Sequence, residues 1–335
     1  MPKRLAGFTV IELALFLILA GVVSFTGWYV YESSKKADES LSNSLIASSD
    51  IQTNTKAQKI VAVGDIVCDP GDPYRLVKNL GYCQDEATYQ LTVKIDPDAV
   101  LALGDLQYND GTLDKFKSHY NKSWGQLKSI TYPVAGNHEY VTNGASGYFS
   151  YFGNRAGEPD KGYYSFDIST WHFIVLNSNC AQISGCGESS QQLEWLKQDL
   201  AASTRQACVA AFWHHPRFTS GKYLTDSASR NLSSAFWVEL VNNHVEVVLN
   251  GHDHIYERFA LQNSAGEADQ KGPRQFTVGT GGKELYKRKA VVPNSEVLID
   301  DSFGVLVIDL YLKAYRWQFI STEGKILDSG SQKCT

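Results

Sequence analysis

The stretch that decides the fold is residues 99–108, which read AVLALGDLQY. Its five leading apolar residues predict a short buried strand, and the Gly104-Asp105 step ends that strand in a polar loop. From residue 59 onward, apolar runs that end in Gly or Asp alternate with segments of helical spacing. The predicted buried strands are 60–66, 99–103, 130–135, 173–176, 209–213 and 245–249. This alternation predicts a layered α/β domain whose strand ends lead into loops.

Helical spacing is found in the segments between these strands, at 85–95, 113–124, 189–202 and 227–242. The third of them begins with Ser189-Ser190-Gln191-Gln192, which is a capping-box pattern. The region 275–321 is richer in strands, which are predicted at 277–279, 304–310 and 315–320. The Gly-rich run 277–282 lacks the spacing of a nucleotide-binding loop and is predicted to be a tight turn at a strand end.

Composition excludes several classes of protein. The 335 residues allow one large domain or two ordinary ones. With 43% hydrophobic and 20% charged residues, the chain is neither disordered, collagenous nor a coiled coil. The net charge is -5 and the longest basic run is Lys287-Arg288-Lys289, so general nucleic-acid binding is not expected. An anionic substrate would therefore need a local source of positive charge.

The N-terminus contains one strongly apolar segment, residues 8–31, with Glu12 as its only charge. As a helix it is long enough to cross a membrane, and Lys3 and Arg4 before it predict a cytoplasmic N-terminus. Everything after Tyr31 would then lie outside the cytoplasmic membrane, or be secreted if the tail is removed. A carboxylate in such a segment costs about 2 kcal/mol or more, so Glu12 is expected to have a partner or a task.

The run Gly7-Phe8-Thr9-Val10-Ile11-Glu12 resembles the class III signal of type IV pilins and pseudopilins. The resemblance implies cleavage after Gly7, methylation of Phe8, and pairing of Glu12 with the amine of a neighbouring subunit in a pilus-like assembly. A plain signal anchor or a long cleaved signal peptide is the alternative. Residues 32–56 are rich in Ser, Thr and Asn and are predicted to form a stalk, either helical or flexible.

The domain boundaries follow from this tail: 1–31 as the pilin-like membrane segment, 32–56 as the stalk and 57–335 as the main domain. Residues 1–56 contain five basic and five acidic residues, so the whole net charge of -5 belongs to the main domain. Six cysteines lie in that domain, at 68, 83, 180, 186, 208 and 334. An even number outside the cytoplasm predicts disulfides, first Cys180 with Cys186 and then Cys68 with Cys83. Cys208 and Cys334 would pair or stay free.

Five polar clusters follow predicted strands, where open α/β sheets place their ligand sites. They are Gly64-Asp65, Gly104-Asp105-Leu106-Gln107-Tyr108, Gly136-Asn137-His138-Glu139, His214-His215-Pro216 and Gly251-His252-Asp253-His254. Each cluster alone has a structural explanation, as a helix cap, a turn or a hydrogen-bonded core histidine. Together they offer carboxylate, phenolate, amide and imidazole ligands without thiolate, which suits Fe, Mn or Zn.

In this order the clusters resemble the calcineurin-like metallophosphoesterases, and more narrowly the purple acid phosphatase branch. The resemblance runs from about residue 59 to about residue 320 and implies a four-layer α/β/β/α sandwich with two mixed sheets. Much of the superfamily has Asp-x-His as its first motif, whereas this chain has Asp65-Ile66-Val67. The purple acid phosphatase branch also lacks that His and uses a Tyr three residues after the second Asp, where this chain has Tyr108.

The resemblance implies two metal ions and seven ligands. The first ion, Fe(III) in this branch, would take Asp65, Tyr108 and His254. The second, which would be Fe, Zn or Mn, would take Asn137, His214 and His252. Asp105 would bridge both ions. His214 is preferred to His215 because the family pattern is His-x-Pro. Asp253 is expected to point away from the metals and Arg258 to be structural.

Three further residues are the candidates for catalysis. His138 resembles the substrate-binding and proton-relaying His of the family. Many members of the branch carry another His beyond the fourth motif as general acid, but here Tyr223 lies near that place. Either Tyr223 or His215 would take the role, or the enzyme would prefer esters with good leaving groups. Arg217 and Lys222 would contact substrate or be solvated loop charges.

The predicted function is hydrolysis of small phosphomonoesters by a hydroxide activated by two metals. The metals would also supply the positive charge that the acidic domain lacks. Two alternatives are kept. The same site would act on diesters or nucleotides, or the domain would be a pilin-like surface binding module with a vestigial site.

Overall fold

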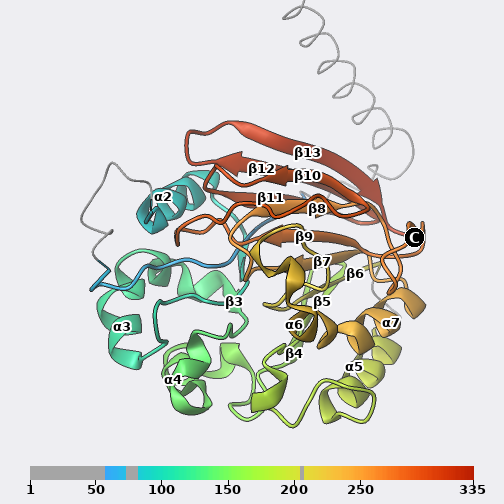
Figure 1. Ribbon diagram of the computed structural model, residues 1–335, viewed down its shortest axis with the longest axis horizontal. Helices are drawn as coiled ribbons and strands as arrows, with labels where there is room; N and C mark the ends of the chain where they lie inside the picture. The colour runs from blue at the N-terminus through green and yellow to red at the C-terminus, as the bar shows by residue number, and fades with distance from the viewer. Residues whose placement is uncertain (1–56, 73–81, 204–206) are drawn as a thin grey trace, which may run out of the picture. The chain divides into compact units, whose positions relative to one another are not determined.

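Two mixed β-sheets form the centre of the structure, a computed structural model that describes residues 57–72, 82–203 and 207–335 (Figure 1). The first sheet contains, in order across it, β13 (Ile326–Lys333), β12 (Ala314–Ser321), β11 (Gly304–Tyr311), β1 (Gln58–Val63), β2 (Ala99–Ala102) and β3 (Thr131–Pro133). The second contains β10 (Ser295–Ile299), β8 (Tyr256–Phe259), β9 (Arg274–Val278), β7 (Val247–Asn250), β6 (Cys208–Phe212), β5 (Trp171–Val175) and β4 (Tyr164–Ile168). The predicted pair of mixed sheets is therefore confirmed.

Each sheet has a parallel part that is flanked by antiparallel strands. In the first sheet β1, β2 and β3 are parallel, and β11, β12 and β13 continue it antiparallel. In the second, β5, β6, β7 and β9 are parallel, while β4, β8 and β10 are antiparallel. The carboxyl ends of the parallel strands share one edge in each sheet, which brings together the loops that follow them.

Helices cover the outer faces of the sheets. The helices are α2 (Asp85–Ile95), α3 (Leu113–Ser118), α4 (Ser146–Phe152), α5 (Gln191–Ala202), α6 (Ser227–Asn231) and α7 (Ser234–Asn242). Short 3-10 helices are η2 (Tyr120–Lys122), η3 (Trp124–Ile130), η4 (Glu139–Val141), η5 (Asn143–Ala145), η6 (Gly153–Ala156), η7 (Cys180–Gln182) and η8 (Lys222–Thr225). Figure 1 shows α2, α3 and α4 beside one sheet and α5 and α7 beside the other.

Alternating side chains explain the layers. In β1, Ile60 and Ala62 pack into the core between the two sheets, while Val61 and Val63 pack outward with Phe116 of α3. Side chains of α5 and α7 form a third core with the outer face of the second sheet. A strand that is buried on both faces is apolar throughout, so β1 is visible in the sequence as a continuous apolar run. The order of layers is helix, sheet, sheet, helix.

Two predicted helices are shorter than expected. The segment 113–124 ends as an α-helix at Ser118, because the Tyr120 N–H donates to Gln107 Oε1 at 3.1 Å instead of to a helix carbonyl. The segment 227–242 is divided into α6 and α7. At the break the Ser233 and Ser234 hydroxyls donate to the backbone carbonyls of Arg230 and Asn231, a local bond that competes with the helix.

The capping box expected at Ser189 is not formed. Ser190 caps α5 instead, since its hydroxyl accepts the Leu193 N–H at 3.2 Å. Gln192, the expected partner in the box, points into the protein and bonds both backbone groups of Asn177. The prediction of α5 itself is confirmed, but its first residue lies two positions later.

Three disulfides join the six cysteines. Cys68–Cys83 and Cys180–Cys186 confirm the predicted pairs. Cys208 and Cys334, which the sequence allows to pair or to stay free, form the third disulfide. The expected membrane segment 8–31 and the stalk 32–56 lie outside the described residues. Within the described ranges, no helix is both long and apolar enough to span a bilayer.

Candidate metal centre

Five loops at the carboxyl ends of parallel strands bring the predicted ligands together. Asp65 follows β1, the Asp105–Tyr108 loop follows β2 and Asn137 follows β3 in the first sheet. His214 follows β6, and the His252–His254 loop follows β7 in the second sheet. The sequence places a turn directly after each strand, so these polar side chains leave the sheets at the same edge.

Three of these positions have a left-handed backbone. The φ angles are 60° at Asp65, 51° at Asp105 and 68° at His252. For residues other than glycine this conformation costs on the order of 1–3 kcal/mol and is concentrated at functional sites. Surrounding hydrogen bonds hold it, including the His252 N–H that donates to Asp65 Oδ2 at 2.8 Å.

The first group of donor atoms consists of Asp65, Tyr108 and His254. The Tyr108 hydroxyl lies 2.9 Å from Asp65 Oδ1 and 3.0 Å from His254 Nε2. His254 Nδ1 donates to the Glu284 carbonyl at 2.6 Å, which leaves Nε2 directed at the other two. Burial and the charges of Asp105 and Asp65 raise the pKa of Tyr108 well above its usual value, so a cation would be needed to ionise it.

Asp105 connects this group to a second one. Its Oδ2 lies 3.2 Å from the Tyr108 hydroxyl and 3.2 Å from His214 Nε2. The His214 ring donates from Nδ1 to the Leu103 carbonyl at 2.8 Å. Burial lowers the pKa of His214, but the Asp105 carboxylate outweighs burial and raises this pKa to about 9, so without a metal Nε2 carries a proton toward Asp105. A bound cation would take the place of that proton between the ring and the carboxylate.

One buried atom of the second group, Asn137 Oδ1, lacks a hydrogen-bond partner. An unsatisfied buried polar atom costs about 1–3 kcal/mol. Asn137 belongs to the predicted ligand set. The residues present therefore fit a site for hard or borderline metal ions.

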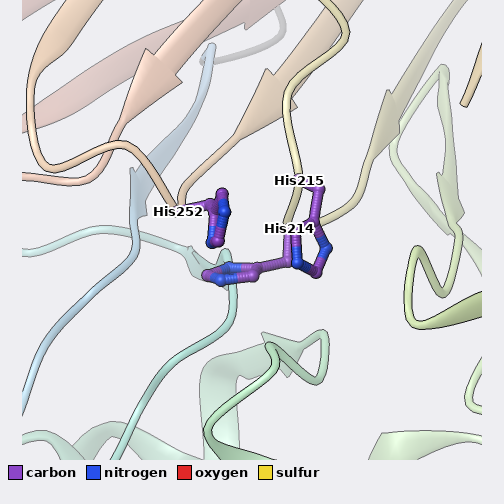
Figure 2. A group of neighbouring side chains, drawn as sticks. All are labelled: His214, His215 and His252. Atoms are coloured by element: carbon purple, nitrogen blue, oxygen red, sulfur yellow. The ribbon is translucent and has the colours of Figure 1, made fainter. Parts of the chain in front are cut away.

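Figure 2 shows the imidazoles of His214, His215 and His252 grouped together, two from the loop after β6 and one from the loop after β7. Each offers a donor atom within 4.8 Å of the others, and Asp65, Asp105 and His214 form a second such group. The His215 and His252 ring centroids are 4.2 Å apart. Burial and the neighbouring His214 lower the pKa of His215 to about 3, so His215 is neutral at ordinary pH. Its Nδ1 is hydrogen-bonded to Ser178 Oγ at 2.8 Å.

His138 is the accessible member of the site, with 30% of its side chain exposed. Its backbone N–H donates to Asp105 Oδ1 at 2.8 Å, and its Nδ1 contacts the Asn109 carbonyl at 2.6 Å. The ring lies 4.4 Å from that of Tyr108. This geometry leaves Nε2 toward the open side of the site, 3.9 Å from Asp105 Oδ2.

Tyr223 lies over the second histidine cluster. Its ring stacks on His252 with centroids 3.9 Å apart and planes 23° apart. Burial raises the pKa of Tyr223 to about 12, so the phenol keeps its proton at neutral pH. Arg217, a possible substrate contact from the sequence, instead donates to Asn231 Oδ1 and to backbone carbonyls of Arg230 and Ser264.

The sequence did not reveal the role of Glu139. This buried carboxylate accepts N–H groups of Asp105 at 2.9 Å, Leu106 at 2.9 Å and Gly136 at 2.7 Å. Glu139 therefore fixes the loops after β2 and β3 relative to each other. Burial and the Asp105 charge raise the pKa of Glu139 to about 7. Its only signal in the sequence was its place beside His138.

Tyr286 was also missed, because about 30 residues separate it from the proposed ligand His254 that it contacts. Its ring stacks on His254 at 3.9 Å with planes 9° apart. The Gly-rich run continues from β9 and packs closely against the loop after β7: a Cβ on Gly279 would lie 2.2 Å from the Asp253 carbonyl oxygen. Arg258 is structural as expected, since its Nε donates to Asp328 at 2.8 Å.

The chain is similar in sequence and in fold to known proteins. The sequence profile of the family described as calcineurin-like phosphoesterase matches residues 58–256. Purple acid phosphatase 15 of Arabidopsis thaliana is 28% identical over 220 residues, covering 56% of this chain and 40% of that protein. Fe(3+)-Zn(2+) purple acid phosphatase 12 of the same plant is 27% identical over 270 residues, covering 69% of this chain and 53% of that protein.

The fold is similar to that of a solved structure, the purple acid phosphatase PPD1 from yellow lupin (Lupinus luteus) seeds. The TM-score is 0.69 with 18% sequence identity, and the superposition covers 83% of this chain and 54% of that chain. The chain spans about half the length, or less, of these relatives.

Proposed function

Because the chain belongs to the calcineurin-like phosphoesterase family, we propose that it hydrolyses phosphate monoesters at a centre of two metal ions. The observation that carries this proposal is the set of contacts between side chains of separate strand-end loops: the Tyr108 hydroxyl with Asp65 and His254, and Asp105 with Tyr108 and His214. A binding module could hold a metal in the same way, so the activity test below decides between the two.

We assign the donor residues to two ions that share one ligand. Asp65, Tyr108 and His254 would hold one ion, and Asn137, His214 and His252 would hold the other, with Asp105 between them. A pair of such ions lowers the pKa of a bound water and neutralises charge on the phosphoryl oxygens. The phenolate of Tyr108 favours Fe(III) at the first position, and the Fe(3+)-Zn(2+) relative supports Zn at the second. Fe or Mn would also suit the imidazole and amide ligands of the second position.

The chain's own groups would bind and orient the ester. His138 presents Nε2 on the open side, where it can donate to a phosphoryl oxygen once substrate binds. Tyr223 keeps its proton at neutral pH and can donate to the leaving oxygen. A departing alkoxide is a stronger base than a phenolate, so this proton transfer is favourable. His215 is neutral and bonded to Ser178, which favours Tyr223 over His215 as the donor.

We also propose display of the domain outside the cytoplasmic membrane, anchored through residues 8–31 in a pilin-like manner. Three disulfides support an oxidising compartment. Sequencing the N-terminus of protein from the native membrane tests the anchor. A mature chain that begins at Phe8 is expected, and one that begins at Met1 or Ala37 would contradict processing of the pilin type.

The activity is tested on the purified full-length chain with an aryl phosphate and a bis-aryl phosphate, side by side. Faster hydrolysis of the monoester is expected, whereas faster hydrolysis of the diester would favour the phosphodiesterase alternative. Metal analysis should give about two ions per chain. A visible absorption band that disappears in Tyr108→Phe would identify Fe(III) bound to this tyrosine.

The Asp105→Asn variant separates an enzyme from a binding module. Loss of the shared carboxylate should reduce kcat/KM by about a hundredfold or more. A metal-loaded wild-type protein that hydrolyses neither ester would refute the enzymatic proposal and favour a binding module with a vestigial site.

A further inference from the structure

Asp253 lies between the two histidines of the last cluster, yet its side chain serves a different segment. The carboxylate is fully buried and accepts three hydrogen bonds from the loop 219–223. The Thr219 hydroxyl donates to Oδ2 at 2.6 Å, the Lys222 N–H to Oδ1 at 3.0 Å, and the Tyr223 N–H to Oδ2 at 3.3 Å. One side chain thus satisfies two backbone donors and one hydroxyl of a loop 30 residues away.

The loop is shaped to fit this carboxylate. A Cβ on Gly221 would lie 2.5 Å from both Asp253 oxygens, closer than any side chain can approach. The Gly221 N–H donates to Thr219 Oγ1 at 3.0 Å, so the loop closes on the same hydroxyl that binds Asp253. A buried carboxylate that receives several N–H donors fixes their geometry strongly, because leaving any of them unpaired is costly.

The loop carries groups that cover both neighbouring histidines. Tyr223 stacks on His252, and the Lys222 ammonium lies 3.9 Å from the centre of the Tyr286 ring. Tyr286 stacks in turn on His254, and its hydroxyl is hydrogen-bonded to that of Tyr223. The two histidines on either side of Asp253 are therefore each covered by a tyrosine ring, and the loop that Asp253 binds joins the two rings.

We infer that Asp253 is a positioning residue, which anchors the loop 219–223 so that the Tyr223 hydroxyl stays over the metal centre. This inference rests on the proposed phosphoesterase function and adds the residue that places the proton donor. Asp253 acts through the loop and contacts neither the ester nor the ions. In Asp253→Asn an N–H₂ group replaces one acceptor, so at least one loop donor loses its partner and Tyr223 moves from its place.

A double-mutant cycle tests this coupling with Asp253→Asn, Tyr223→Phe and the double variant of the full-length, metal-loaded protein. We expect Asp253→Asn to lower kcat by about 10- to 100-fold for an alkyl phosphate, whose leaving alkoxide takes the Tyr223 proton, and by much less for an aryl phosphate. Metal content and KM should change little. In the Tyr223→Phe background the same substitution should lower kcat by no more than about twofold. Effects that simply multiply, or loss of metal from Asp253→Asn, would overturn the inference.

Hydrogen exchange provides a readout that needs no activity. In Asp253→Asn, peptides that cover 219–225 should exchange faster than in wild type, while peptides from α5 should not change. Asp199→Asn is the matched control, because this mostly buried carboxylate also accepts a side-chain hydroxyl, from Ser165 at 2.7 Å, away from the ligand loops. It should leave both the exchange of 219–225 and kcat as in wild type.

The two proposals fail in distinguishable ways. If wild-type protein hydrolyses no ester, the phosphoesterase function fails, and exchange alone decides whether Asp253 anchors the loop. Unchanged exchange and unchanged kcat in Asp253→Asn would overturn the positioning role. If Asp253→Asn does not fold, Gly221→Ala takes its place, since its Cβ displaces the same loop while the carboxylate remains. It should show the same coupling to Tyr223→Phe.

Discussion

Asn137 Oδ1 is a buried atom of the candidate site that has no hydrogen-bond partner. Its loop reaches the proposed shared ligand, since the N–H of the neighbouring His138 donates to Asp105 Oδ1 at 2.8 Å. A metal ion bound at Asn137 Oδ1 would use the lone pairs that the protein leaves unpaired.

The Asn137→Leu variant tests this explanation. Without metals, its free energy of unfolding should equal or exceed that of wild type by up to about 1 kcal/mol, because an unsatisfied oxygen is removed. With metals, wild type should be stabilised more than the variant. Thermal unfolding of both proteins, with chelator and with added Fe and Zn, measures the difference. An equal metal-induced shift in both proteins would show that Asn137 binds no ion.

The sequence pointed to the five polar clusters because residue types and places after strands both carry information, and the family resemblance then assigned the ligands within them. It could not assign Glu139 or Tyr286. Glu139 acts by accepting backbone N–H groups from two loops, and Tyr286 by stacking on His254. Such contacts depend on how distant segments meet in space, which leaves no local pattern.

At the level of helices and strands, most of the buried parallel strands were readable in the sequence, while the edge strands β10 and β13 were not. β13 is largely exposed and reads ILDSGSQK, which has no apolar alternation. β10 is also only partly buried along its length. The helix from 113 ended early because a side chain from another loop, Gln107, bound the Tyr120 N–H. The helix propensity of residues 113–124 does not show that a side chain from another loop binds one of their backbone N–H groups.

One cluster joins β4, β5 and α5 and should make stability depend on pH. His172 contacts Asp167 at 2.7 Å through Nδ1 and Asp199 at 2.8 Å through Nε2. Burial lowers the pKa of His172, but hydrogen bonds to Asp199 and Asp167 outweigh it and raise the pKa above 6.5. A raised pKa in the folded state stabilises the protein below pH 6.5, and this stabilisation is lost as the pH rises through the raised value.

Replacement of this histidine by Gln should therefore cost most at low pH. We expect His172→Gln to lower the free energy of unfolding by about 1–3 kcal/mol at pH 6 and by clearly less at pH 9. Urea unfolding of wild type and variant over this range measures the difference. Parallel stability curves would show that the charged imidazolium contributes nothing.

For the molecule as a whole, the disulfides differ in what they constrain. Cys208–Cys334 spans 126 residues and joins the first residue of β6 to the residue that follows β13, in the other sheet. Cys180–Cys186 spans only 6 residues within one loop. The chain-entropy relation gives about 5 kcal/mol for the long loop and about 2 kcal/mol for the short one.

Removing each bond as a pair of Cys→Ala substitutions tests this difference. The Cys208/Cys334 variant should lose about 2–3 kcal/mol more free energy of unfolding than the Cys180/Cys186 variant. Denaturant unfolding under non-reducing conditions measures both. Equal losses would mean that local packing, and not loop length, decides what each bond contributes.

The position of β1 in the middle of its sheet has a consequence for biosynthesis. One of its edges pairs with β2, which follows soon after, but the other pairs with β11, which is made only after the whole second sheet. Until β11 is made, one edge of β1, a strand whose last four residues are fully buried in the finished protein, has no partner strand. An open, apolar edge is a template for pairing with other chains. A nascent chain that stalls before residue 304 should therefore depend on chaperones, even with every proposed metal ligand already made.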